Sequence, residues 1–473
     1  MKRVAALLFL MLVSLAAPTA ARADARVLDA VLKGDRNALR ELLRNHADPE
    51  SAQPDGSTAL MLAAERGEVG IADLLIRAHA NVNAANDYGA TALWVASAGG
   101  HVAVIKVLLN AGANPNAPLL SGETPLMTAV DNGQIEAVRL LLDRGANVNA
   151  KETKGGQTAL MWAAANKSAD IVELLVRRGA AVGARSKGSF TALLFAAQQG
   201  NIESGRALLQ AGADVNDSRS TDHMTGLMMA AASGNEAFSI FLLDHSANPD
   251  LTDERGYTAL HYAASNRSGA PMVRALLAHR ANPNPRTTKD TRANTTSGVS
   301  NQGATPLFLA ASLGNIETVR ALVAGGADPF MTTERGTAPL QVATWGGDPY
   351  FRDWTEEEKK NLFDVTTLLV ELGADVNSAG EHGWTALHGA AYKGVDRAVQ
   401  FLIERGARMD DFDEYGQTPL SIANAIITVD SKDAYYQSSR VVRQSTSDLL
   451  LTLGARPLSE SGVRIFDRFY KQP

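Results

Sequence analysis

The sequence predicts an all-α fold, a helical repeat solenoid in which short helix pairs stack side by side and short β-hairpin connectors join them. Three observations lead to this prediction. A Thr-Ala-Leu or Thr-Pro-Leu motif recurs at near-constant spacing, an Asn-Val-Asn-like landmark follows most copies by 22 residues, and the residues between them have the pattern of two short helices.

The motif occurs eleven times, and successive copies begin 33, 33, 34, 33, 34, 33, 47, 33, 47 and 33 residues apart. Counting back from the landmark at Ala47 places a degenerate first repeat at Ala25, so we expect about twelve repeats. The eleven copies begin at Thr58, Thr91, Thr124, Thr158, Thr191, Thr225, Thr258, Thr305, Ala338, Thr385 and Thr418.

Each repeat has the same physical order. Thr is placed to cap a helix N-terminus, and Pro, where it follows, falls in the first turn, where its missing N–H is harmless. Leu and a pair of small Ala residues give this first helix a tight packing face. A second amphipathic helix, such as 171–176, ends at glycine, and a connector rich in Asn, Asp and Gly, such as 81–89, follows it. One such pair cannot bury its apolar face alone, so neighbouring pairs must stack.

These strings resemble the ankyrin-repeat family, whose signature is Thr-Pro-Leu-His-x-Ala on a 33-residue period. The resemblance covers about 25–455, and the copies that contain His261 and His388 come closest to the signature. It implies an ankyrin-repeat stack that grips partners at connector tips and at the exposed, concave side of the first helices. With its N-terminal signal, Ala-rich repeats and late insertions, the chain looks like a long secreted bacterial ankyrin protein.

Residues 1–23 are typical of a signal peptide. Lys2 and Arg3 precede a 14-residue apolar run, and Ala21-Arg22-Ala23 has the form of a cleavage site. The run spans about 21 Å as a helix, too short for a bilayer core of about 30 Å, although an uncleaved anchor remains the alternative. We therefore expect cleavage after Ala23, a periplasmic or secreted protein, and no membrane association once the signal is removed.

The remaining chain divides into a solenoid over 24–455 and a C-terminal capping tail over 456–473. Three insertions interrupt the period. Residues 285–303 are polar and predict an extended, mobile loop. In the insertion 347–361, Thr355 and Glu358 form a capping box that predicts a lengthened helix to about Leu372. Residues 425–447 enlarge the last repeat.

Composition and motifs exclude several functions. The formal charge of −6 is too mild and of the wrong sign for nucleic acid, and without cysteine there is no disulfide or thiol chemistry. No phosphate-binding loop, nucleophile elbow or zinc-protease motif is present, so we expect no enzyme, no cofactor and no metal. The acidic run that contains Asp410, Asp411, Asp413 and Glu414 predicts a solvated connector.

Large side chains at the variable positions of the connectors and first helices are our candidates for partner binding, because Tyr and Trp are typical binding anchors. Packing against neighbouring connectors is the alternative for each of them. The candidates are Tyr88, Phe190, Met224, Tyr257, Trp345, His382, Trp384, Tyr392, Lys393 and Tyr415. Of these, Phe190, Met224 and Tyr257 occupy one register position in consecutive repeats and predict an apolar ladder.

The sequence thus predicts an exported scaffold that binds an unidentified protein partner and acts as a monomer. Two other functions stay open. One is a secreted effector or toxin-associated factor that acts outside the producing cell. The other, weaker one is an enzyme with its site in the insertions 285–303 and 347–361, which lack histidine and a Ser–His–Asp set.

Overall fold

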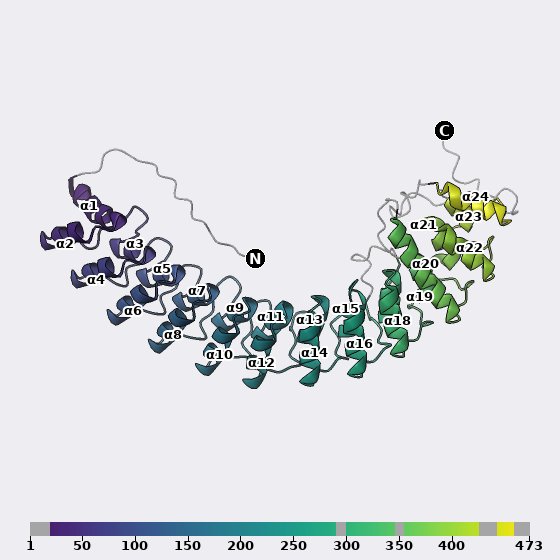
Figure 1. Ribbon diagram of the computed structural model, residues 1–473, viewed down its shortest axis with the longest axis horizontal. Helices are drawn as coiled ribbons and strands as arrows, with labels where there is room; N and C mark the ends of the chain where they lie inside the picture. Colours follow the sequence, from purple (N-terminus) through teal and green to yellow (C-terminus); the bar gives the residue numbers. More distant parts are fainter. Residues whose placement is uncertain (1–18, 290–298, 346–353, 425–441, 458–473) are drawn as a thin grey trace. The chain divides into compact units, whose positions relative to one another are not determined.

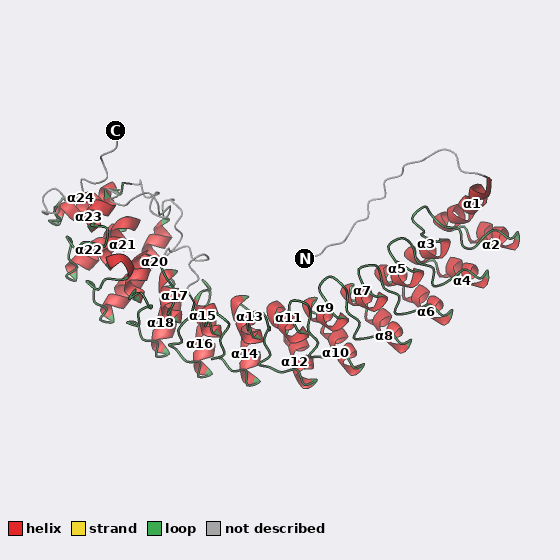
Figure 2. Ribbon diagram, turned by 180° about the vertical axis from the view of Figure 1, so that it is seen from behind, coloured by secondary structure: helices red, strands yellow, loops and turns green. Residues whose placement is uncertain are grey.

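A computed structural model describes residues 19–289, 299–345, 354–424 and 442–457 of the chain (Figure 1). Within these ranges the structure has twenty-four α-helices, a short 3-10 helix at Glu381–Gly383 and no strand (Figure 2). The helices form twelve consecutive pairs, as the repeat count predicted. No helix in the described ranges is both long enough and apolar enough to span a membrane.

The chain divides into two units, which meet in sequence around α11 and α12. Unit 1 comprises Met1–Ala192 and Arg206–Gly212, and unit 2 comprises Leu193–Gly205 and Ala213–Pro473. The helices are α1 (Thr19–Lys33), α2 (Arg36–Arg44), α3 (Ala59–Glu65), α4 (Val69–Arg77), α5 (Ala92–Gly99), α6 (Val102–Asn110), α7 (Pro125–Asp131), α8 (Ile135–Asp143), α9 (Ala159–Ala165), α10 (Ala169–Arg177), α11 (Ala192–Gln199), α12 (Ile202–Gln210), α13 (Gly226–Ala232), α14 (Glu236–Asp244), α15 (Ala259–Ala264), α16 (Ala270–Ala278), α17 (Pro306–Ser312), α18 (Ile316–Ala324), α19 (Pro339–Trp345), α20 (Glu356–Glu371), α21 (Ala386–Lys393), α22 (Asp396–Glu404), α23 (Pro419–Ala423) and α24 (Gln444–Thr452).

The first helix of most repeats begins at the predicted Thr cap. In α3, Oγ1 of Thr58 accepts a hydrogen bond from the Met61 N–H at 3.3 Å, which satisfies an otherwise unpaired donor of the first turn. Leu60, Ala63 and Ala64 are at most 1% exposed. The small size of Ala63 and Ala64 lets the first helices of neighbouring repeats approach closely, and this contact forms the core.

Histidines mark several helix C-termini. His46 and His79 adopt left-handed backbone with φ of 61° and 67°, a conformation that glycine supplies in other repeats. His245 and His279 are C-caps whose Nδ1 atoms lie 2.7 and 2.8 Å from the carbonyl oxygens of Phe241 and Ala275.

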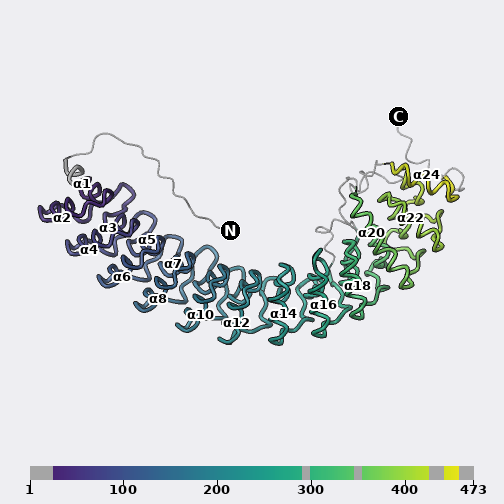
Figure 3. The backbone as a smooth tube through the Cα atoms, viewed as in Figure 1, coloured from purple at the N-terminus to yellow at the C-terminus, as the bar shows by residue number. Residues whose placement is uncertain are grey.

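The connectors are tight turns, and Figure 3 follows them between the helix pairs. In the connector before α5, the Asn86 N–H donates to the Ala90 carbonyl at 3.0 Å, and a single antiparallel bridge joins Ala85 to Thr91. The predicted hairpins therefore exist as hydrogen-bonded turns with isolated bridges, while extended strands are absent from the described part of the chain.

A ladder of asparagines joins successive repeats at the base of the connectors. Asn149 illustrates it, because its Nδ2 donates to the Gly179 carbonyl at 3.2 Å and its Oδ1 accepts from the Ala181 N–H at 2.8 Å. Asn116 makes the same pair of bonds to Gly145 and Asn147. The landmark of the sequence is thus a contact between repeats.

The insertions differ in how well they were predicted. The capping box of Thr355 and Glu358 is confirmed at the start of α20, which ends at Glu371 with Leu372 as its C-cap. In contrast, residues 299–301 of the polar insertion 285–303 are buried rather than extended into solvent. They are held there because Asn301 bonds to Tyr257 and the Ser300 N–H bonds to Glu381.

Parts of other predictions lie outside the described residues, namely 1–18, 290–298, 346–353, 425–441 and 458–473. Within the insertion predicted at 425–447, residues from Gln444 onward belong to α24, the second helix of the twelfth repeat. At the start of the tail, Nε of Arg456 pairs with Oδ2 of Asp410 at 2.8 Å.

Candidate functional site

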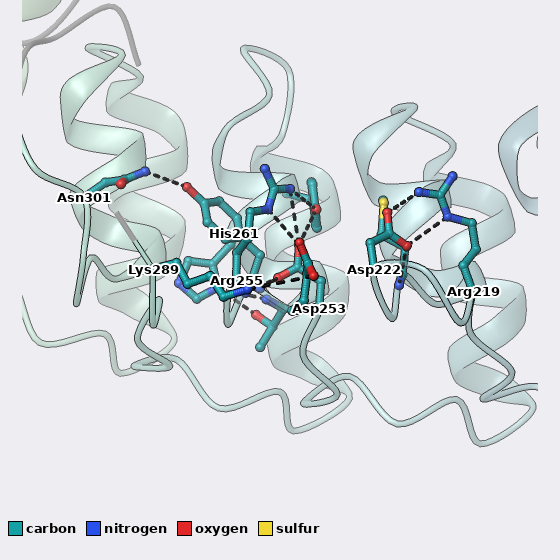
Figure 4. A network of polar contacts seen from close by, with 12 residues as sticks. Arg219, Asp222, Asp253, Arg255, His261, Lys289 and Asn301 are labelled. Carbon is teal, nitrogen blue, oxygen red and sulfur yellow. Dashed lines mark hydrogen bonds and ion pairs between the residues drawn. The ribbon is translucent and has the colours of Figure 1, made fainter. Parts of the chain in front are cut away.

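A buried carboxylate organises the connector before α15 (Figure 4). The Asp253 side chain is only 1% exposed, and its Oδ1 accepts hydrogen bonds from the backbone N–H groups of Arg255 and Tyr257, both at 2.8 Å. Its Oδ2 accepts from the Tyr262 hydroxyl at 2.8 Å and from the Arg255 guanidinium at 3.2 Å. One carboxylate therefore shapes the turn and positions two larger side chains.

Arg255 and Tyr262 complete a closed network with Asp253. Nη2 of Arg255 donates to the Tyr262 hydroxyl oxygen at 2.8 Å, and the guanidinium lies 5.0 Å from the centre of the Tyr257 ring. Burial opposes the charge of Arg255, but Tyr262 and Asp253 outweigh it and raise its pKa above the ordinary value. Burial raises the pKa of Tyr262, so its hydroxyl stays a neutral donor. The Arg255 side chain is still 34% exposed, so it is fixed in place and accessible.

The preceding connector adds a second ion pair. Nε of Arg219 donates to Oδ1 of Asp222 at 2.9 Å (Figure 4). The Asp222 carbonyl accepts from the Glu254 N–H at 3.0 Å, which joins this connector to the next. Although burial opposes ionisation, hydrogen bonds from Arg219 and Met224 hold the pKa of Asp222 below its usual value. Two adjacent connectors thus present arginines that their own carboxylates hold in place.

Tyr257, one of the predicted anchors, lies inside this network. It is 9% exposed, its ring packs against His261 and Tyr262, and its hydroxyl accepts from Nδ2 of Asn301 at 2.8 Å. Met224 and Phe190 are half-buried. Phe190 belongs to unit 1 and the other two to unit 2, so the ladder of all three stays a prediction.

The predicted C-terminal candidates come together in two groups. The Trp345 ring contacts the rings of both Trp384 and Tyr392, and the Lys393 ammonium lies 4.0 Å from the centre of the Trp354 ring. Trp384 and Lys393 are 8% and 4% exposed, so packing accounts for most of their surface. Trp345 and Tyr392 remain half-buried.

The second group is His382 and Tyr415. Nδ1 of His382 lies 3.1 Å from the Tyr415 hydroxyl and 3.2 Å from Oε2 of Glu414, on the neighbouring connector. Both side chains are half-buried. Among the residues that the structure describes, no three His, Cys, Asp or Glu side chains are placed to hold a metal ion.

The prediction of a solvated connector is wrong for Asp413. Asp413 is 6% exposed, because its Oδ1 accepts from the N–H groups of Tyr415 and Gln417 and its Oδ2 accepts from Nε1 of Trp384. Asp410 and Asp411 are half-buried and pair with arginines, and only Glu414 is well exposed.

The sequence did not single out Asp253, Arg255 or Tyr262. A signal was present, because Asp253 and Asp413 both stand five residues before the motif Thr of their repeats. Arg255 shares its register position with the candidate Tyr88, and Tyr262 stands four residues after Thr258. Selecting mainly aromatic side chains at the variable positions missed this polar network.

Repeated helix pairs, Thr-capped first helices and hydrogen-bonded connectors define the class of ankyrin-like repeat scaffolds. A family model for ankyrin repeats in three copies matches residues 27–118, 111–186, 151–219, 193–287 and 357–426. A single-repeat model matches 302–334. The matches cover more than half of the chain, which therefore belongs to the ankyrin-repeat family. Ankyrin repeats mediate protein–protein interactions, so the chain is a protein-binding scaffold in this broad sense.

Curated relatives match over parts of the chain. The putative E3 ubiquitin-protein ligase XBAT35 of Arabidopsis thaliana is 34% identical over 119 residues, 25% of this chain and 23% of that protein. Ankyrin repeat and SOCS box protein 3 of Bos taurus is 34% identical over 182 residues, 38% of this chain and 30% of that protein. The chain therefore spans less than a third of the length of these two relatives.

A shorter relative is matched over most of its length. Cyclin-dependent kinase 4 inhibitor B of Rattus norvegicus is 33% identical over 118 residues, 25% of this chain and 79% of that protein. Among solved structures, the human ASB11 ankyrin repeat domain aligns with a TM-score of 0.42 and 27% identity, covering 47% of this chain and 98% of that one.

Proposed function

We propose that this protein is an exported scaffold that binds a protein partner through its first-helix face and its connector tips, and that it is not an enzyme. The observation that carries the proposal is the network of Asp253, Arg255 and Tyr262. Arg and Tyr are enriched among the residues that dominate binding energies. Here both are held by a buried carboxylate before any partner arrives.

Such pre-organisation favours binding, because ordering a long side chain at an interface costs about 0.5–1.5 kcal/mol. Arg255 is bonded to Asp253 and Tyr262 and stacked on Tyr257, so little of this ordering remains to be done. The exposed part of its guanidinium favours a partner that offers a carboxylate or a backbone carbonyl.

Two features support export. The residues of α1 that form the first-repeat core, Val27, Ala30 and Val31, are at most 4% exposed and all follow Ala23. Cleavage after Ala23 would remove the first turn of α1 and leave this core complete. The apolar run before Thr19 has the length of a signal peptide and falls short of a membrane span.

The insertions support a structural role better than a catalytic one. In 347–361, the carboxylate of Glu358 accepts from the Thr355 N–H at 2.9 Å, so it caps α20. Glu356 pairs with Lys359 at 2.8 Å on the first turn of the same helix, where acidic residues stabilise the dipole.

Affinity isolation with the full-length chain tests the proposal. Wild-type protein, Arg255→Ala and a matched control, Arg274→Ala on the exposed side of α16, are expressed in the native organism and recovered from the periplasmic fraction and the medium. We expect one or more proteins to be enriched with wild type and the control and reduced at least tenfold with Arg255→Ala. Equal recovery with all three baits contradicts the proposed surface, and no enriched protein in either fraction contradicts the scaffold.

A further inference from the structure

Two connector tips of unit 1 expose large apolar side chains next to each other. Tyr88 is 62% and Leu120 is 77% exposed, although both belong to tight turns of the repeat. The Leu120 N–H donates to the Tyr88 carbonyl at 3.1 Å, so the two residues occupy adjacent tips. An apolar pair this exposed contributes little to the core and offers a contact for another molecule.

The next two connectors of unit 1 expose lysines. Lys151, Lys154 and Lys187 are all exposed. Nζ of Lys151 donates to the Arg185 carbonyl at 2.7 Å, and Nζ of Lys187 donates to the Thr153 carbonyl at 2.5 Å, so these two ammonium groups lie between the tips.

The one carboxylate among these lysines, that of Glu152, is buried, and its charge interacts with Lys187 alone of the three. Glu152 is 7% exposed, and its oxygens accept from the N–H groups of Lys154, Gly155 and Gln157 at 2.6 to 2.9 Å. It shapes the turn from inside, as Asp253 does in unit 2. The exposed surface of these two connectors therefore carries positive charge.

Backbone hydrogen bonds fix the order of the four tips. The Thr153 N–H donates to the Ser121 carbonyl at 2.8 Å, and the Lys187 N–H donates to the Gly155 carbonyl at 2.7 Å. We call the tips at 86–89, 119–122, 151–156 and 185–189 the unit 1 tip row. It is apolar at its N-terminal end and basic at its C-terminal end, and the exposed Asp87 adds a negative charge at the apolar end.

We infer that the unit 1 tip row binds an acidic segment of a partner protein, whose apolar side chains contact Tyr88 and Leu120 and whose carboxylates contact Lys151, Lys154 and Lys187. This inference rests on the proposed function and names the chemistry of one partner segment. Charge complementarity selects the occupant. A nucleic acid or an anionic membrane carries negative charge along its whole length, so part of that charge would be repelled by Asp87 beside the apolar tips. A segment that is acidic only at one end avoids this repulsion.

The geometry also sets the length of that segment. Neighbouring helix layers lie about 8–10 Å apart, so three steps along the row span roughly 24–30 Å. An extended chain advances about 3.3 Å per residue, which makes the segment about seven to nine residues long.

Fluorescence anisotropy with the full-length protein and a labelled peptide of about twelve residues tests the inference. The peptide carries leucines at one end and glutamates at the other and is synthesised in both orders, and a peptide of the same composition with the two residue types alternating is the comparison. We expect one order to bind at least tenfold more tightly than the alternating peptide, and to weaken as salt rises.

Variants of the protein show whether the peptide binds at the unit 1 tip row. We expect the affinity for the peptide to fall at least tenfold in the double variant Lys154→Glu/Lys187→Glu and, separately, in Leu120→Asp. The control variant Lys106→Glu, on the exposed side of α6, is expected to bind the peptide as wild type does. All these side chains are exposed, so circular dichroism is expected to stay unchanged. Equal affinity for ordered and alternating peptides, or equal affinity of all variants, overturns the inference. So does flotation with phosphatidylglycerol vesicles that depends on Leu120, since it assigns the row to a membrane.

The outcome is separable from that of the proposed function. If affinity isolation recovers a partner equally with wild type and with Lys154→Glu/Lys187→Glu, and the peptide does not bind, only the tip-row inference fails. If a partner is recovered equally with wild type and with Arg255→Ala but the ordered peptide binds as described, the inference stands and only the Arg255 surface is contradicted.

Discussion

Nε1 of Trp384 donates a hydrogen bond to Oδ2 of Asp413 at 2.8 Å, and both side chains are less than 9% exposed. The arrangement repeats that of Tyr262 and Asp253, in which a connector carboxylate binds its own turn with one oxygen and an aromatic side chain with the other. In both places one carboxylate links the connector to the aromatic side chain beside it. Changes in such a carboxylate are therefore expected to affect the turn and the aromatic side chain together.

Asp413→Asn is expected to destabilise unit 2 by about 1–3 kcal/mol, because the buried Nδ2 would face the indole donor and leave it without an acceptor. Chemical denaturation followed by tryptophan fluorescence measures this. Asp411→Asn, on the same connector but half-buried, is the control, with an expected loss below about 1 kcal/mol. An equal loss in both variants would show that the Trp384 bond contributes nothing specific.

Tyr262→Phe removes the hydroxyl that links Arg255 to Asp253 while keeping the ring. We expect partner affinity to fall about tenfold, which corresponds to about 1.4 kcal/mol, because Arg255 loses one of its fixed contacts. Isothermal titration with the recovered partner measures it. If the affinity is unchanged while the midpoint of unfolding falls, the hydroxyl serves only the fold.

His261 makes stability depend on pH. Burial lowers its pKa to about 4, against an ordinary value of 6.5, although the Ala304 carbonyl and Asp253 favour the proton. Between these values the unfolded chain binds a proton that the folded chain excludes, so this contribution is fully present above pH 6.5 and is lost as pH falls toward 4. The loss is at most about 1.4 kcal/mol per pH unit.

His261→Met is the matched variant, because Met161 occupies the same register position in another repeat. The stability advantage of wild type over His261→Met is expected to shrink steadily between pH 7 and pH 5 in urea titrations. An advantage that is constant or grows over this interval would contradict the burial of a neutral His261.

The asparagine ladder offers a stability test within unit 1. Asn149→Asp keeps the acceptor for the Ala181 N–H and loses the donor to Gly179, whereas Asn149→Ala loses both. We expect losses of about 0.5 and about 1 kcal/mol in that order. Asp250 and Asp410 already occupy this register position and accept from the next repeat in the same way. Denaturation midpoints in the reverse order would contradict the two-sided role of Asn149.

Features that depend on nearby residues were predictable from the sequence. The Thr58 cap and the capping box of Thr355 and Glu358 both act within three residues, so their spacing alone identified them. The repeat count followed from the period, since the degenerate first repeat kept the landmark at Ala47.

The site was less predictable, because it depends on contacts between connectors. The acidic run by itself does not show that Asp413 turns inward while Glu414 turns outward, because both are acidic residues of one turn. Only the register position that Asp413 shares with Asp253 distinguishes it. Likewise, Trp384 was selected as an anchor for its size, and its burial follows from Asp413, 29 residues away. Leu120 was passed over as an aliphatic residue, and its 77% exposure is visible only in the folded connector.

Site-specific photo-crosslinking tests the central claim most directly. Benzoylphenylalanine is placed at Tyr88, on a connector tip, and at Trp162, which holds the register position of Tyr262 on the first helix α9 and lies outside the Asp253 network. It is also placed at Lys106 and Arg320, which are exposed on the second helices α6 and α18. After irradiation in cells, we expect covalent adducts with a partner protein from the first two positions and none from the other two. Adducts from the second-helix positions alone, or equally from all four, would contradict a scaffold that binds through its connectors and first helices.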